Sequence, residues 1–120
     1  MSSVAGKIAI VIVSGWDQKA KVMSGLHVAK RIHEAKDANG IDAVEVFLFT
    51  GGVKLLENAE EEVVAMLVEL REQGILMGAC SNQAEAWQVE NTAQEFGVQL
   101  EFARDAFSRY AREGFTVMTF

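Results

Sequence analysis

Residues 7–15 read KIAIVIVSG and decide the fold class. After Lys7, residues 8–13 are all apolar and most of them are β-branched. A strand with one face in water alternates apolar and polar side chains. An unbroken apolar run is instead typical of a strand that is covered on both faces. The run stops at Ser14-Gly15, and a layer of helices on each side of a sheet is the expected arrangement.

Strand-like and helix-like segments alternate along the rest of the chain. The connections between strands are too long for hairpins, which favours parallel pairing. The sequence therefore predicts an α/β fold: a single three-layer α/β/α domain over residues 1–120 with a mainly parallel five-stranded sheet. The expected strands are residues 7–13, 43–50, 75–79, 98–102 and 115–120, and the expected helices are 18–36, 53–58, 58–74 (capped by Asn58 with Glu61), 82–96 and a short one around Phe107 and Tyr110.

Composition narrows the classes of function. The chain has 120 residues, of which 50% are hydrophobic and 23% charged, and this suits one domain with its own core. The net charge is −6 and no basic run occurs, so we expect no nucleic acid partner. The apolar run 8–13 is too short for a signal-peptide core or a membrane span, which predicts a cytoplasmic protein with no membrane partner.

Three loops that follow strands are the candidate site. The carboxyl ends of parallel strands meet at one edge of a sheet, and ligands usually bind there. The loops are residues 14–17, 50–52 and 80–83, and we expect the small residues of the first two to leave room for a ligand beside the backbone. The pair Gly51-Gly52 is too short for a phosphate loop and lacks its lysine. The candidate pocket residues are Gly15, Trp16, Gly51, Gly52, Ser81, Asn82 and Gln83.

Trp16 and Asp17 allow two interpretations. In one, an aromatic wall and a carboxylate stand beside the sulfur of Cys80. In the other, Ser14 caps the first helix, Asp17 reaches back to it, and Trp16 covers the edge of the sheet. We favour the second, because a nearby carboxylate disfavours a thiolate.

Cys80 is the only cysteine in the chain. It is a buried structural thiol, a partner in an intermolecular disulfide, or a reactive thiolate. Asn82 with Glu85 predicts a helix N-cap and its reciprocal partner, which places Cys80 just ahead of a helix start. The free backbone N–H groups there stabilise an anion, and this favours the reactive interpretation.

Four segments together resemble the DsrE/DsrF-like sulfur-relay family. They are KIAIVIVSG (7–15), VFLFTGGV (46–53), GAC (78–80) and GFTVMTF (114–120). The resemblance implies a small α/β subunit that forms homo-oligomers or hetero-oligomers with related subunits. In active members a cysteine at this position carries sulfur as a persulfide, which implies Cys80 as the catalytic residue and sulfur donor and acceptor proteins as partners. The segment after Cys80, SNQAEAW, lacks a second cysteine, so the acceptor thiol comes from another protein.

Two other functions remain open beside sulfur handling. One is a non-catalytic module of the same fold that binds a small ligand or supports assembly, with a structural Cys80. The other is a redox-sensing thiol. We expect neither a metal nor a cofactor, because His27 and His33 face about 120° apart on one helix and no cluster of cysteine and histidine occurs.

Trp87 is the candidate interface residue. On a helix over residues 82–96, Ala86, Val89 and Ala93 lie on the stripe that packs on the sheet, together with Phe96. Trp87 points about 140° away from that stripe, alongside Ala84 and Asn91. Because tryptophan is enriched at interface centres, the pattern predicts that Trp87 contacts a neighbouring subunit or caps the mouth of the Cys80 site.

Overall fold

Five strands form one sheet in the order β4-β3-β2-β1-β5 in the computed structural model, which describes residues 5–58 and 60–120. The predicted α/β class and five-stranded sheet are confirmed. Each pair of neighbouring strands is parallel. The strands are β1 (Gly6–Ile12), β2 (Ile41–Leu48), β3 (Leu76–Cys80), β4 (Val98–Glu101) and β5 (Phe115–Thr119).

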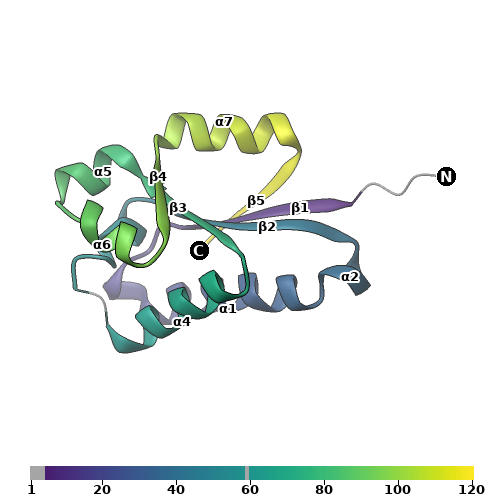
Figure 1. The fold of residues 1–120 in the computed structure, drawn as a ribbon, viewed down its shortest axis with the longest axis horizontal. Coiled ribbons are helices and arrows are strands. Elements are labelled where there is room, and N and C mark those ends of the chain that lie inside the picture. Colours follow the sequence, from purple (N-terminus) through teal and green to yellow (C-terminus); the bar gives the residue numbers. More distant parts are fainter. Residues whose placement is uncertain (1–4, 59) are drawn as a thin grey trace.

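Helices cover both faces of the sheet (Figure 1). The long helices α1 (Lys19–Glu34) and α4 (Glu61–Glu72) lie on one side, and α7 (Ala103–Glu113) lies on the other. The steps from β1 to β2 and from β2 to β3 run in one direction, so right-handed crossovers place α1 and α4 on the same face. The step from β4 to β5 runs back across the sheet and places α7 on the opposite face. The shorter helices are η1 (Trp16–Gln18), α2 (Lys36–Asn39), α3 (Gly51–Lys54), α5 (Ser81–Ala86) and α6 (Glu90–Glu95).

Burial follows the sequence pattern in β1 and only in part in the edge strand β4. Residues 9–12 of β1 are each at most 1% exposed, as their unbroken apolar run predicts. In β4, whose sequence alternates apolar and polar residues, Val98 is buried and Gln99 is exposed, but Leu100 is exposed although it shares a face with Val98. Among the helices of the described residues, none has the length and apolar character needed to cross a bilayer.

Several helix ends differ from the prediction. The first helix is interrupted at Ala35, where φ is −98° and ψ is 11°, and a short α2 follows. The chain then ends the helix at Gly40, with a left-handed φ of 69°, as expected. The helix α4 begins after Glu60, so the predicted cap at Asn58 is wrong. Helix α7 is longer than expected, with 11 residues.

The predicted helix over residues 82–96 is broken into α5 and α6. The N–H of Val89 donates to the carbonyl of Ala84 (2.9 Å), and that of Gln88 to the carbonyl of Glu85 (3.2 Å). These two bonds form a Schellman motif around Gln88, whose φ is 55°. Glycine usually takes this position, so the sequence carries no signal of the break. As a result Ala84 is fully buried and Ala86 is exposed, and the predicted stripe is wrong in this part of the segment.

Candidate functional site

The three predicted loops meet at the carboxyl edge of the sheet. The loop after β1 approaches the loop after β2 so closely that a Cβ on Gly51 would lie 2.7 Å from the backbone nitrogen of Gly15. The loop after β2 is joined to α5 by a hydrogen bond of 2.7 Å from the backbone N–H of Thr50 to Oε1 of Gln83. The sequence therefore predicted correctly which loops lie together.

The glycines at this edge have a different use from the predicted one. A Cβ on Gly52 would lie 2.1 Å from the carbonyl oxygen of Ile12, and one on Gly51 would lie 2.7 Å from the carbonyl oxygen of Val13. The backbone that leaves β1 thus fills the space beside both residues. Their small size lets α3 pack directly on that backbone, and it leaves no free volume for a ligand at these two positions.

Cys80 lies where the candidate chemistry requires it. It is the last residue of β3 and the N-cap residue of α5, so the predicted place just ahead of a helix start is confirmed. The predicted cap at Asn82 is wrong, because the N-cap residue lies two residues earlier, at Cys80, and the helix begins at Ser81. By strand register Cys80 pairs with Glu101 and shares the face of the sheet that α7 covers. The residue is 4% exposed and its thiol is free.

An open depression of about 470 Å³ lies beside Cys80. Asn82 and Gln83, both predicted pocket residues, line it with the cysteine. Four further lining residues, from the ends of β2 and β4 and from the start of α7, were not predicted from the sequence: Phe49, Phe102, Ala103 and Arg104. One signal for them was present, since residues 102–104 also follow a parallel strand and so belong at the same edge.

Thr50 holds a strained backbone conformation at the centre of these loops. Its φ is 52° and its ψ is −114°, a region that a β-branched residue rarely adopts. The Thr50 hydroxyl donates toward the carbonyl of Val13 (3.1 Å) and that of Phe49 (2.7 Å), while the backbone N–H is bound by Gln83. The bonds to Val13 and Gln83 join this residue to both neighbouring loops, so they hold the strained geometry in place.

Trp16 and Asp17 lie outside the Cys80 depression as far as the described residues show. Trp16 is half-buried against the core, and its buried indole Nε1 has no hydrogen-bond partner among residues 5–58 and 60–120. Asp17 is exposed. The first helical turn, η1, begins after Gly15, so the predicted cap by Ser14 is also wrong. Trp16 therefore serves mainly to cover the core, which is part of the interpretation that the sequence favoured.

Trp87 is half-buried, which the predicted continuous helix did not suggest. It ends α5 and packs against the core, and the ammonium group of Lys54 lies 4.8 Å from the centre of its ring. The premise that Trp87 shares an outward face with Ala84 is wrong, since Ala84 is 0% exposed.

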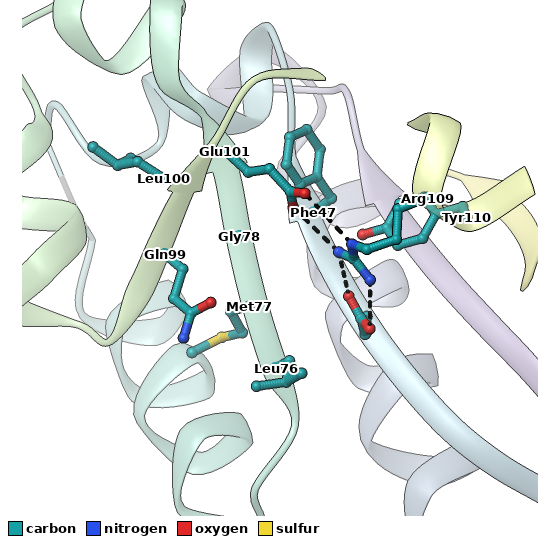
Figure 2. A pocket seen from close by; sticks show the side chains of 10 residues that line it. Phe47, Leu76, Met77, Gly78, Gln99, Leu100, Glu101, Arg109 and Tyr110 are labelled. Carbon is teal, nitrogen blue, oxygen red and sulfur yellow. Dashed lines mark hydrogen bonds and ion pairs between the residues drawn. The ribbon is translucent and has the colours of Figure 1, made fainter. Parts of the chain in front are cut away.

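A network of three charged side chains lies on the same face of the sheet, below the Cys80 depression. Arg109 of α7 donates two hydrogen bonds to Glu45 on β2 (3.0 and 3.1 Å) and two to Glu101 on β4 (3.2 and 3.4 Å). Glu45 is 9% exposed. The three residues line a hollow of about 250 Å³. Figure 2 shows Arg109 reaching from α7 to Glu101. Nothing in the sequence pointed to this network.

The pKa values of Arg109 and of the neighbouring Tyr110 are both raised. The hydrogen bonds to Glu45 and then to Glu101 raise the pKa of Arg109, which keeps its charge fixed. Burial raises the pKa of the neighbouring Tyr110 hydroxyl well above its usual range, and the carboxylate of Glu45 adds to this effect. Residues 5–58 and 60–120 bring together no group of three His, Cys, Asp or Glu side chains that could hold a metal ion.

Solved structures with this arrangement of strands and helices exist. The chain shares their fold. The conserved protein of unknown function BT1422 from Bacteroides thetaiotaomicron is 20% identical, with a TM-score of 0.74 over 93% of this chain and 94% of that one. The ychN protein from E. coli is 16% identical, with a TM-score of 0.73 over 96% and 99%. The protein of unknown function MTH1491 from Methanobacterium thermoautotrophicum is 18% identical, with a TM-score of 0.67 over 94% and 99%. No protein-family model and no curated protein matches the sequence.

Proposed function

We propose that this chain is a small cytoplasmic sulfur-handling protein in which Cys80 accepts sulfane sulfur as a persulfide and passes it to the thiol of a partner protein. The observation that carries the proposal is the place of Cys80: it ends β3, begins α5 and lines an open depression. The resemblance of residues 7–15, 46–53, 78–80 and 114–120 to the DsrE/DsrF-like family supports the same function.

The proposed reaction is two thiol exchanges at sulfur. The Cys80 thiolate attacks the outer sulfur of a donor persulfide, the bond between the two donor sulfurs breaks, and the donor thiolate leaves with the electron pair. A partner thiolate then attacks the outer sulfur of the Cys80 persulfide, and the Cys80 thiolate leaves. The acceptor comes from another molecule because the chain has no second cysteine.

Groups that carry positive charge lie close to Cys80. The backbone N–H groups of Ser81, Asn82 and Gln83 lie in the first turn of α5 and carry partial positive charge. Arg104 adds a cation at the rim: 80% of its side chain is exposed, and its guanidinium pairs with Asp105 and lies 5.6 Å from the centre of the Phe102 ring. The ring of Phe49 is half-buried in the same wall, where it limits access of water.

Partner docking fits the shape of this edge. Cys80 is 4% exposed, so an acceptor thiol approaches through the depression rather than across a flat surface. We also propose that the chain assembles with copies of itself or with related subunits, and that Trp87 contributes to such a contact. Large apolar side chains that remain exposed support assembly: Val13, Leu76, Leu100, Phe102, Val117 and Met118.

The second candidate is a non-catalytic module with a structural Cys80. The observation in its favour is that Cys80 belongs to the buried core cluster. Incubation with inorganic polysulfide, followed by removal of the excess and cyanolysis, separates the two candidates. Sulfur handling predicts one equivalent of thiocyanate per wild-type chain and none from Cys80→Ser. Equal, negligible release from both chains would favour the structural role.

A further inference from the structure

Arg109 links α7 to two strands, β2 and β4, that are not neighbours in the sheet. Its guanidinium joins α7 to β2 through Glu45 and to β4 through Glu101, while β3 runs between those two strands. The exposed fraction of the side chain is 26% for Arg109, 11% for Glu45 and 32% for Glu101, so the hydrogen bonds between them are partly shielded from water. Figure 2 shows the guanidinium pointing from α7 toward Glu101.

Glu101 connects this network to the Cys80 depression. It is the in-register partner of Cys80 across the β3–β4 ladder. The three residues that follow it, 102–104, form one wall of the depression, which Asn82 and Gln83 also line. The strand β4 is short and lies at the edge of the sheet, so its ladder with β3 is its only strand pairing in the described chain. Arg109 adds a tether at the end of β4 where that wall begins.

We propose that Arg109 is a positioning residue: by holding Glu101 and Glu45 at once, it fixes the wall of residues 102–104 over Cys80 and so sets how far the thiol is accessible. The role of this wall in sulfur transfer rests on the proposed function, but its effect on the thiol does not. A second tether to the same helix exists, because the ring of Phe107 packs edge-on against Phe47 and Phe49. Loss of Arg109 is therefore expected to loosen the wall without detaching α7.

The planar guanidinium is essential to this role. Arginine presents several N–H donors in a rigid fork that can hold two carboxylates in fixed directions, whereas the lysine ammonium is a compact charge on a flexible stem. Arg109→Lys keeps the charge that the buried Glu45 requires and removes the fork. This variant therefore tests whether the fork positions the wall of residues 102–104, while the positive charge beside Glu45 is retained. Arg112→Lys on the same helix is the matched control, since Arg112 is exposed.

The experiment is alkylation of Cys80 by iodoacetamide in the folded chain, followed by mass spectrometry. The sole thiol makes the rate a direct measure of access to this site. Arg109→Lys should raise the rate about tenfold, the factor expected from loss of one charge-assisted hydrogen bond, and Arg112→Lys should leave it unchanged. Glu101→Gln weakens only the link from Arg109 to β4, and it should also raise the alkylation rate of Cys80.

Urea below the unfolding transition distinguishes a loosened wall from a merely less stable protein. Alkylation through a local opening is nearly independent of urea, while alkylation through global unfolding rises steeply with it. A rate in Arg109→Lys that equals wild type, or one that rises with the global urea dependence, would overturn the proposal. If Arg109→Lys does not fold, Glu101→Gln decides by the same criteria. A chain that never takes up sulfur would refute the proposed function and leave this result standing.

Discussion

Substitution of Gly52 by alanine tests the finding that the glycines at the carboxyl edge pack backbone against backbone. The new Cβ would lie 2.1 Å from the carbonyl oxygen of Ile12 and 3.1 Å from its carbonyl carbon. Both atoms belong to the buried central strand, so neither can move away at small cost. Overpacking of a core costs about 1–3 kcal/mol, and a contact this short with backbone belongs at the upper end. For a chain of this size, about 3 kcal/mol lowers Tm by about 12 °C.

Urea unfolding followed by circular dichroism measures this change, with Gly15→Ala as the matched control. At Gly15 the nearest atom to a new Cβ is the carbonyl oxygen of Gly51 at 3.3 Å, and the φ of −117° suits alanine, so we expect a change below about 1 kcal/mol. A Gly52→Ala chain as stable as wild type would refute the packing argument. It would restore the earlier interpretation that this space serves a ligand.

Three further predictions concern single residues. Because burial raises the pKa of Tyr110 above its usual value, the unfolded chain ionises first and the free energy of unfolding falls as the pH rises above about 10. Tyr110→Phe should abolish that part of the pH dependence. Tyr110 is the only tyrosine in the sequence, so its ionisation can be followed by phenolate absorbance; ionisation at about pH 10 in the folded chain would contradict the raised pKa. Trp87→Ala should lower the free energy of unfolding by about 2 kcal/mol, since core packing and the contact with Lys54 are lost. If Trp87 also contributes to a subunit contact, light scattering should show a smaller assembly mass for this variant than for wild type. Cys80→Ser should change stability by less than about 1 kcal/mol, because serine is a good N-cap residue, and a circular dichroism spectrum of an unfolded chain would indicate a packing role instead.

The sequence predicted the fold where one pattern dominates. The unbroken apolar run 8–13 required cover on both faces. The alternation in residues 98–102 indicated a strand that has one face in water or lies at an edge, and β4 is an edge strand. The break at Gln88 was missed because a glutamine takes the left-handed position that usually belongs to glycine. Since that break changes the helical phase, it also invalidated the orientation assigned to Trp87.

The sequence predicted the part of the candidate site that directly follows one strand, and it missed the contacts between distant segments. Cys80, Asn82 and Gln83 follow one strand directly, so their position at the carboxyl edge follows from the parallel sheet. The network of Arg109 joins residues that lie far apart in the sequence, and no local pattern reveals such pairs. The use of Gly51 and Gly52 was misjudged because glycine permits close approach equally well to a ligand and to another part of the backbone.

The most direct test of the central claim is the intact mass of the chain after incubation with a sulfane-sulfur donor such as inorganic polysulfide. Sulfur handling predicts a gain of one sulfur atom that maps to the peptide containing Cys80 and is lost when an excess of an acceptor thiol is added. The Cys80→Ser chain should gain nothing under the same conditions. An unmodified wild-type mass with every donor tried, or an equal gain in the Cys80→Ser chain, would contradict the claim.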